Sequence, residues 1–215
     1  MEKWLSEFSS LSQSLLKTAA GIEIIICPAL SLVTTVAKWL ADHRSNLPVS
    51  LGVQDISPYP AGAYTGAVSA RNLDGLGVKY ALVGHSERRH YFHENHQDVA
   101  NKVSQCLENG MTPIVCVDVD YLQAQANAIK AEELARCLVA YEPLTAIGSG
   151  ENQPVAEVEP IVKQVRQAFG SETVIYGGSV TPANVAAYAP VTDGVLVGTD
   201  SLDPAVFTQL IAHLI

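Results

Sequence analysis

Sulfur-containing residues are scarce in this 215-residue sequence, which has four cysteines and two methionines. Three of the cysteines, Cys27, Cys116 and Cys137, lie in apolar runs, and none of the four, Cys106 included, belongs to a Cys-x-x-Cys pair. This scarcity argues against a disulfide-stapled secreted fold and against a cysteine-rich zinc site. We therefore expect reduced, partly buried thiols in a cytoplasmic protein.

Positive charge is also scarce, because 13 lysines and arginines stand against 22 aspartates and glutamates, a formal net charge of −9. We expect neither a nucleic-acid partner nor an anionic membrane for such a chain. An anionic substrate must be held locally, by backbone amides and helix ends. No apolar run approaches the roughly 20 residues that span a bilayer. The N-terminal MEKWLSEFSSLSQSLLK lacks the apolar core of a signal peptide.

Short apolar runs rich in β-branched residues recur along the chain. Each is nearly continuous rather than alternating, which is typical of strands buried on both faces of a parallel sheet. The predicted strands are residues 22–27, 48–53, 79–84, 113–117, 137–142, 173–178 and 194–198.

Segments with helical periodicity separate these strands. Residues 95–109 and 154–169 are each followed by a glycine, which commonly ends a helix. Thr181-Pro182 and Asp203-Pro204 are typical of an N-cap followed by a first-turn proline. Alternating strands and helices predict right-handed crossovers and a parallel sheet. Because no linker or composition break divides the chain, residues 1–215 are predicted to form a single domain.

The order of the elements is unusual, because a helix over residues 2–17 precedes the first of the seven strands. A closed (β/α)8 barrel begins with a strand. The simplest explanation is an α/β barrel of this kind whose first β-strand is absent from this chain, through a start chosen too far downstream or through fragmentation. A doubly wound open sheet also tolerates seven strands, so the number of strands alone does not decide between the barrel and the open sheet.

Four short segments lie at or just beyond the C-terminal ends of predicted strands, where barrels and open α/β sheets both place their sites. The first is GHSERR, residues 84–89. A helix N-terminus facing His85 would lower the pKa of the imidazole and keep it neutral, so that it can donate a hydrogen bond to a carbonyl. The alternative is a capping turn with a salt-bridged glutamate–arginine pair.

The second segment is AYEPLTAIGSG, residues 140–150. Glu142 closes an apolar strand, where a carboxylate is unfavourable unless it has a function. Partial burial would raise its pKa toward that of a useful general base. Pro143 stiffens the exit from the strand and the Gly-Ser-Gly end provides hinge freedom, which together are typical of a lid over a ligand. The alternative is a glycine-rich surface loop.

The other two segments, YGGSV at residues 176–180 and DGVLVGT at residues 193–199, follow the last two predicted strands. Their small residues let backbone N–H groups approach a phosphate, and the helix that follows adds favourable charge. Loops after the last two strands of a barrel often form such a site.

With these four segments in this order, the sequence resembles the triosephosphate isomerase family. The resemblance extends to Gln54-Asp55 and to residues 62–66, which are similar to the family's third-strand end and to its loop that reaches into a neighbouring subunit. It covers residues 21–215. It implies a (β/α)8 TIM barrel that interconverts dihydroxyacetone phosphate and D-glyceraldehyde 3-phosphate without a metal or organic cofactor, as a homodimer or homotetramer.

The resemblance also assigns roles to individual residues. Glu142 would move the proton between C1 and C2, and His85 would polarise the carbonyl and stabilise the enediolate. The residues that would contact the substrate phosphate are Ile147, Gly148, Ser179, Gly198 and Thr199. The residues that would support the catalytic pair are Ser86, Glu87 and Cys116.

The sequence departs from the family where its first strand would end in Asn-x-Lys. No such segment precedes the first helix, and Lys3 and Lys17 lie within that helix. An impaired or inactive sugar-phosphate-binding barrel is therefore the alternative function. The stretch from Cys116 to Glu142 is short and is similar to the compact archaeal forms. His90, His93 and His96 have a spacing that suggests a metal, but with Glu94 and Asn95 between them we expect no metal site.

Overall fold

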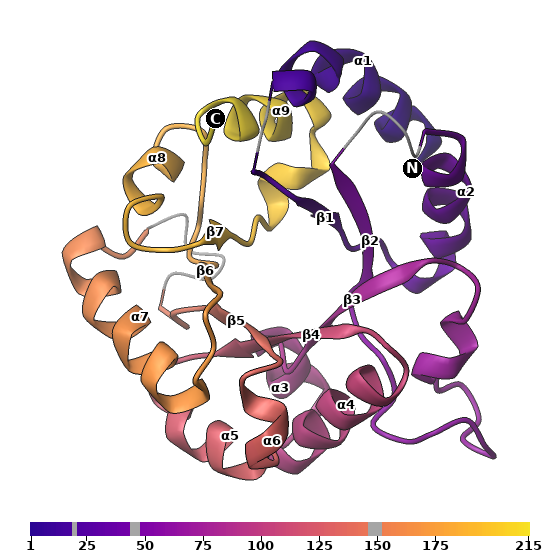
Figure 1. Cartoon of the computed structure of the whole chain (residues 1–215), viewed down its shortest axis with the longest axis vertical. Coiled ribbons are helices and arrows are strands. Elements are labelled where there is room, and N and C mark those ends of the chain that lie inside the picture. Colours follow the sequence, from indigo (N-terminus) through magenta and orange to yellow (C-terminus); the bar gives the residue numbers. More distant parts are fainter. Residues whose placement is uncertain (19–20, 44–47, 146–151) are drawn as a thin grey trace.

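The computed structural model describes residues 1–18, 21–43, 48–145 and 152–215. In these residues seven parallel strands form one sheet whose spatial order equals the sequence order, and the sheet curls around a common centre (Figure 1). The strands are β1 (Ile24–Ile26), β2 (Val49–Val53), β3 (Val78–Val83), β4 (Thr112–Val117), β5 (Leu138–Tyr141), β6 (Val174–Tyr176) and β7 (Gly194–Val195).

Helices surround the sheet as an outer ring. The helices are α1 (Glu2–Thr18), η1 (Leu30–Leu32), α2 (Val33–His43), η2 (Ala70–Leu73), α3 (Ser86–Phe92), α4 (His96–Glu108), α5 (Leu122–Ala128), α6 (Ala131–Leu134), α7 (Val155–Phe169), α8 (Val185–Tyr188), η3 (Thr199–Leu202) and α9 (Pro204–Ala212). A parallel sheet in sequential order with helices outside it is a barrel arrangement, whereas a doubly wound sheet changes direction within its strand order. The barrel prediction is confirmed.

The predicted absence of a first strand is also confirmed for the described residues, because α1 is followed by a seven-stranded sheet. Strand pairing joins β1 to β2 and β6 to β7, and no described pairing joins β1 to β7. On the outside of the sheet, α1 packs against α9 (Figure 1). None of the described helices has the length and apolarity that crossing a membrane requires.

Helix ends were predicted well where capping chemistry is local. Asp203 caps α9 by accepting hydrogen bonds from the N–H groups of Ala205 and Val206, and Gly170 ends α7 with φ +62°. The prediction of a helix that begins at Pro182 was wrong. Residues 182–184 form a turn in which the Asn184 N–H donates to the Thr181 carbonyl, and α8 begins at Val185.

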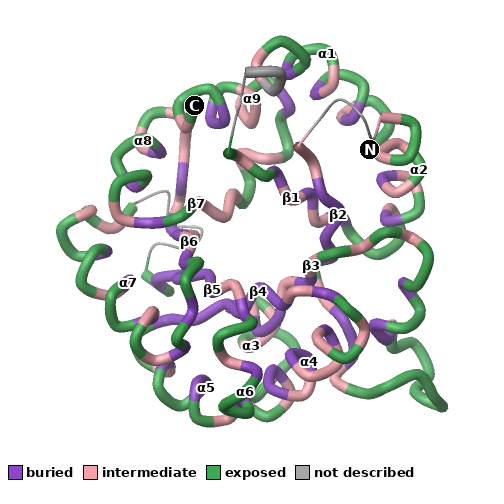
Figure 2. Tube along the Cα trace, in the orientation of Figure 1, coloured by how far each residue is buried: buried purple, intermediate pink, exposed green. Residues whose placement is uncertain are grey.

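Side chains alternate between two apolar regions along the strands. The larger region lies between sheet and helices and includes Val115, Val117, Val139 and Tyr141. The smaller region is separate and contains Ile114, Cys116 and Ala140 from the alternate positions of β4 and β5. Buried residues accordingly run along the strands (Figure 2). Because strand side chains have a period of two, residue 142 continues the inward-facing row of β5.

Candidate active site

Glu142 directly follows β5 at the carboxyl end of the sheet and is 1% exposed. Its N–H donates to the Val117 carbonyl at 2.8 Å, so the segment stays paired to β4 one residue past the end of the strand. One carboxylate oxygen, Oε1, contacts His85, whereas Oε2 is buried without a hydrogen-bond partner among the described residues. The carboxylate therefore has one oxygen held by the imidazole and one buried oxygen that accepts no described hydrogen bond.

His85 is the N-cap of α3. Its Nδ1 accepts a hydrogen bond from the Glu87 N–H at 3.3 Å, and its Nε2 lies 3.1 Å from Glu142 Oε1. The two predicted catalytic residues, 57 positions apart in the sequence, are thus brought together at the ends of β3 and β5. Because Nδ1 receives a backbone N–H, a neutral ring carries its proton on Nε2, where it faces Glu142.

The electrostatic prediction for His85 was wrong in direction. Burial lowers its pKa, but the hydrogen bond and negative charge of Glu142, with a further contribution from Glu87, outweigh burial and raise the pKa above the usual 6.5. The expected helix terminus is present through the Glu87 N–H. The helix terminus does not determine the direction of the pKa shift, because α3 presents only a partial positive charge to the ring, whereas Glu142 presents a full negative charge at contact distance.

The supporting residues lie around this pair in different ways. Cys116 pairs in register with Ala140, two residues before Glu142, and faces the same side of the sheet, and burial followed by the Glu142 charge raises the pKa of its thiol well above its usual value. Ser86 is buried, with an Oγ that has no hydrogen-bond partner in the described part of the chain. Glu87 is largely exposed, with Oε2 3.8 Å from His85 Nδ1.

The expected phosphate loops sit at the ends of the last two strands. Ser179 adopts φ +51°, and Gly198 and Thr199 are exposed at the start of η3. Ile147 and Gly148, predicted to contact the phosphate, lie outside the described residues. The structure adds a role for Gly177 that sequence reasoning missed, because a Cβ at this position would lie 3.0 Å from Glu142 Cγ. A side chain at residue 177 would therefore press on the Glu142 side chain, which would have to shift by a few tenths of an ångström.

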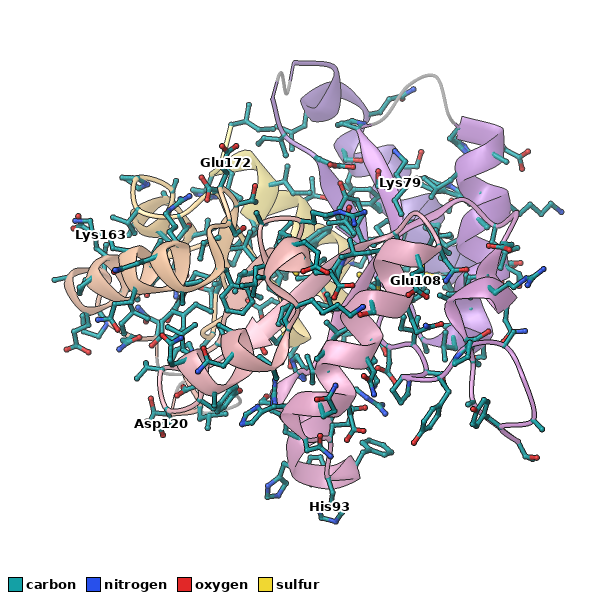
Figure 3. All side chains as sticks on the ribbon, turned by 60° about the horizontal axis from the view of Figure 1, so that its bottom comes forward. Lys79, His93, Glu108, Asp120, Lys163 and Glu172 are labelled. Carbon is teal, nitrogen blue, oxygen red and sulfur yellow. The ribbon has the colours of Figure 1, made fainter. Side chains whose placement is uncertain are left out.

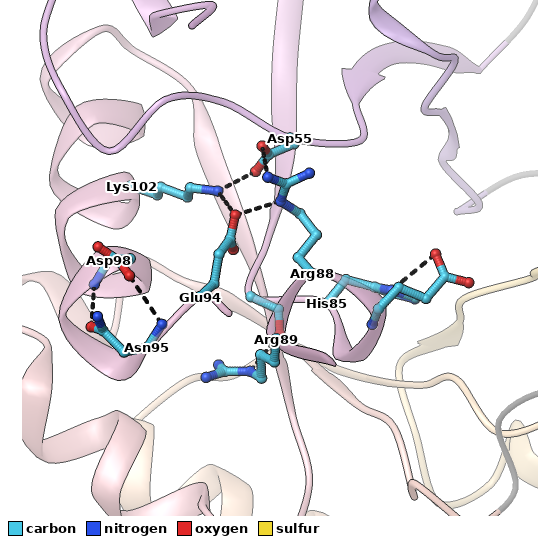
Figure 4. Close-up of polar contacts among 10 residues, drawn as sticks. Asp55, His85, Arg88, Arg89, Glu94, Asn95, Asp98 and Lys102 are labelled. Carbon is cyan, nitrogen blue, oxygen red and sulfur yellow. Dashed lines mark hydrogen bonds and ion pairs between the residues drawn. The ribbon is translucent and has the colours of Figure 1, made fainter. Parts of the chain in front are cut away.

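A buried charge cluster behind the catalytic turn was also missed. Lys102 on α4 is 1% exposed and forms ion pairs with Asp55, at 2.5 Å, and with Glu94, while Arg88 pairs with the same two carboxylates at 3.0 Å and 2.5 Å (Figure 4). Burial is the main influence on the pKa of Asp55 and raises it, and Lys102 and Arg88 lower it. The available signal was a lysine on the apolar face that Val99, Val103 and Cys106 define in α4.

Arg89, the last residue of the GHSERR segment, fixes that turn against the neighbouring strand. Its Nε donates to the Gly84 carbonyl at 2.7 Å, and its guanidinium donates to Gln125 Oε1 at 2.8 Å and lies over the Tyr121 ring. The alternative of a capping turn with a glutamate–arginine pair is therefore partly correct. The arginines do hold the turn, but Arg88 pairs with Asp55 and Glu94, not with Glu87.

No cationic side chain is paired with the catalytic residues in the described part of the chain. Lys3 lies on α1 with its side chain 87% exposed, paired with Glu7. The three histidines after the turn do not converge. His93 ends α3 and projects outward (Figure 3), whereas His96 contacts Gln125 and Arg89. No group of three potential metal ligands exists among the described residues.

Comparison with known proteins agrees with this geometry. The triosephosphate isomerase family model matches residues 1–214, and so includes α1, which precedes the resemblance noted in the sequence. A triosephosphate isomerase of Symbiobacterium thermophilum is 38% identical over 219 residues, covering 90% of this chain and 84% of that protein. One from Cutibacterium acnes is 36% identical over 88% of this chain and 82% of its own length. One from Chloroflexus aurantiacus is 34% identical over 99% of this chain and 95% of its own length. The chain therefore belongs to the triosephosphate isomerase family.

Proposed function

We propose that this chain interconverts dihydroxyacetone phosphate and D-glyceraldehyde 3-phosphate through an enediolate, with Glu142 as the base and His85 as the hydrogen-bond donor. The observation that carries the proposal is the 3.1 Å contact between Glu142 Oε1 and His85 Nε2 at the carboxyl end of the barrel. Triosephosphate isomerases are themselves the established example of a glutamate base paired with a neutral histidine.

The geometry supports a division of labour between the two side chains. Glu142 Oε2 is buried without a partner in the described residues, so it can accept a proton from a substrate carbon. His85 carries its Nε2 proton toward the same space, because Nδ1 is occupied by the Glu87 N–H. A substrate carbonyl at Nε2 would replace the Glu142 oxygen and receive that hydrogen bond, which stabilises the negative charge that develops on the enediolate.

The phosphate site remains a proposal. Ser179, Gly198 and Thr199 are candidates to bind the phosphate through backbone N–H groups, together with Ile147 and Gly148, which lie outside the described residues. Local donors of this kind are needed because the chain has a net charge of −9. Ser86, Glu87 and Cys116 are proposed to support the catalytic pair.

An isomerase assay of the purified chain tests this function. We expect turnover of D-glyceraldehyde 3-phosphate, and a fall in kcat of about 10²- to 10⁴-fold for Glu142→Gln, the range for loss of a general base. The control is Glu159→Gln, which removes an exposed carboxylate on α7. A Glu142→Gln variant as active as the control would overturn the assignment. The alternative, a sugar-phosphate-binding barrel, is not favoured by relatives that are named as isomerases. If the chain bound the triose phosphate without turning it over, the sugar-phosphate-binding alternative would be favoured instead.

We also propose that the chain self-associates as a homodimer or homotetramer and is cytoplasmic. The segment between β2 and η2 projects from the barrel (Figure 1), and it carries Tyr59 and Tyr64, two exposed rings stacked with centroids 4.5 Å apart. Rings presented in this way support a homodimer or homotetramer. Sedimentation equilibrium with Tyr64→Ser as the disrupting variant tests it, and a monomeric unmodified chain would contradict it.

Four unpaired cysteines support a cytoplasmic location.

A further inference from the structure

Asp118, directly after β4, is a buried carboxylate that the catalytic scheme does not use. It is 6% exposed, and no described lysine or arginine forms an ion pair with it. Its Oδ1 accepts the N–H of Asp120 at 2.9 Å, and its Oδ2 accepts the N–H of Leu144 at 2.8 Å. A buried carboxylate without a cation depends on such backbone donors. One of these donors lies 26 residues away.

The distant donor belongs to the segment that carries the catalytic base. The last strand partners of β4 and β5 are Val117 and Tyr141. Beyond them, the Glu142 N–H donates to the Val117 carbonyl, Pro143 has no N–H, and the Leu144 N–H donates to Asp118. The Asp118 side chain therefore continues the β4–β5 pairing past the point where the backbone ladder ends. Both backbone donors that flank Pro143 are held by consecutive residues of one neighbouring segment.

The opposite side of this segment is closed by the end of β6. A Cβ on Gly177 would lie 3.0 Å from Glu142 Cγ, and a Cβ on Gly178 would lie 3.0 Å from Pro143 Cγ. The segment is thus packed on one side and hydrogen-bonded on the other. The Leu144 N–H donates to Asp118 Oδ2 on the β4 side of the segment. Removing the Asp118 carboxylate would therefore release residues 142–144 on that side, where no described packing contact replaces the hydrogen bond.

We propose that Asp118 is a positioning residue for the isomerisation, because its carboxylate holds residues 142–144 so that Glu142 stays within reach of His85. The proposal rests on the proposed function, since it names how the base of that reaction is placed. Asp118 acts through the backbone of Leu144 and does not contact the reacting atoms. Its effect is therefore on the alignment of Glu142, and such misalignment lowers kcat more than it changes KM.

Three variants of the full chain test this role. Asp118→Ala removes both acceptors, Asp118→Asn keeps one oxygen for one of the two amide donors, and Asp120→Asn removes an exposed carboxylate of the same turn that accepts no described hydrogen bond. For each variant we would measure hydrogen exchange at the Leu144 amide, the titration of the His85 ring by NMR, and kcat and KM. Thermal melts establish which variants are folded.

In Asp118→Ala we expect the Leu144 amide to exchange at least about tenfold faster, as loss of a charge-assisted hydrogen bond predicts. The His85 titration should move to lower pH, because Glu142 no longer stays at contact distance. We expect kcat to fall by about tenfold to a hundredfold at nearly unchanged KM. Asp118→Asn should lie between Asp118→Ala and the unmodified chain in all three measurements, and Asp120→Asn should match the unmodified chain.

The proposal is overturned if Asp118→Ala leaves the Leu144 exchange and the His85 titration unchanged, or if Asp120→Asn alters them equally. If Asp118→Ala does not fold, the same two measurements are compared between Asp118→Asn and Asp120→Asn, and equal values in these two variants overturn the proposal. The exchange and titration measurements need no turnover. An inactive chain with an Asp118-dependent His85 titration would therefore refute the isomerase function while retaining the structural role of Asp118.

Discussion

The indole Nε1 of Trp4 donates a hydrogen bond of 2.9 Å to the backbone carbonyl of Ser201, 197 residues later in the chain. The same ring stacks on Phe8 with centroids 5.0 Å apart and lies 6.0 Å from the ring of Phe207. These contacts join α1 to η3 and α9. They cross the part of the barrel wall where no described strand pairing links β1 to β7, so helix packing connects the two ends of the sheet.

Replacement of Trp4 should therefore destabilise the whole domain. For Trp4→Ala we expect a loss of about 2–4 kcal/mol in the free energy of unfolding, somewhat below the range for a fully buried aromatic ring. Trp4→Phe keeps most of the ring and should lose about 1 kcal/mol, the typical value of one hydrogen bond. Urea denaturation measures both. Trp39→Phe is the matched control, because no described hydrogen bond uses its indole N–H, and equal losses in the two phenylalanine variants would contradict the prediction.

The strands of this barrel were predictable because they are buried on both faces. Continuous apolar runs such as residues 113–117 have no other common explanation, and β4 spans Thr112–Val117. Capping residues were predictable where the donor and acceptor are close in sequence, as at Asp203. At Pro182 the same local rule failed, because the Asn184 side chain accepts the Thr181 N–H and stabilises a turn before the helix begins.

It was predictable that His85 and Glu142 lie at one site, but the electrostatics of their contact were not. His85 and Glu142 were placed by their segments at strand ends, which meet at one edge of a parallel sheet. The direction of the His85 pKa shift depends on a 3.1 Å distance across the barrel, and sequence spacing does not contain that distance. The same limit applies to Lys102 and Asp118. Each of these two residues has one distant partner on another segment, Asp55 at 47 residues for Lys102 and Leu144 at 26 residues for Asp118.

The stability contribution of His85 should depend on pH in a definite direction. Glu142 raises the folded-state pKa of His85 above the usual 6.5, so folding favours the protonated ring. Such a group contributes its full stability below the unfolded pKa and loses that contribution as pH rises through the folded pKa. The stability advantage of the unmodified chain over His85→Gln should therefore be largest below the usual pKa of 6.5 and should shrink as pH rises above it.

Urea denaturation of both proteins across this range measures the difference. The control is His90→Gln, in a residue of the same helix whose ring contacts Tyr91 edge-on. Because His90 forms no described ion pair, this variant separates the effect of the His85–Glu142 contact from the effect of removing a histidine from α3. An advantage over His85→Gln that grew with rising pH would show that the pKa of His85 is lowered and that the predicted sign is wrong.

Lys102 holds two carboxylates that burial would otherwise disfavour. Lys102→Met should lower the free energy of unfolding at neutral pH by about 3–5 kcal/mol, the range for breaking a buried ion pair on one side. Burial already raises the pKa of Asp55 and Lys102 lowers it, so removal of Lys102 should raise that pKa further. A carboxyl with a raised folded-state pKa stabilises the fold when protonated, so the deficit should shrink as pH falls from 7 toward the usual 3.8 of Asp55.

Equilibrium unfolding at several pH values tests this prediction. Lys163→Met is the control, since Lys163 is 72% exposed in its pair with Glu159, and exposed pairs contribute between nothing and about 1 kcal/mol. A Lys102→Met deficit no larger than that of Lys163→Met would show that the buried cluster contributes little to stability. A deficit that grew on acidification would contradict the role assigned to Asp55.

Gly178 is required because a side chain at its position has no space. A Cβ there would lie 2.2 Å from the Tyr176 hydroxyl oxygen and 3.0 Å from Pro143 Cγ. Tyr176 has little freedom to move, because its ring is fully buried and stacks on Tyr188 with centroids 4.3 Å apart. Gly178→Ala should therefore lower the free energy of unfolding by about 1–3 kcal/mol through overpacking, and it should lower kcat because Pro143 follows the catalytic Glu142.

A double-mutant cycle identifies the clash itself. Tyr176→Phe removes the hydroxyl oxygen nearest to the new methyl group, together with its hydrogen bond from the Gln153 N–H. If that oxygen causes the clash, Gly178→Ala should destabilise the Tyr176→Phe background by less than it destabilises the unmodified chain, with a coupling of about 0.5 kcal/mol or more. Strict additivity of the two substitutions would assign the loss to Pro143, and a Gly178→Ala variant as stable as the unmodified chain would show that the residues around Gly178 move to make room.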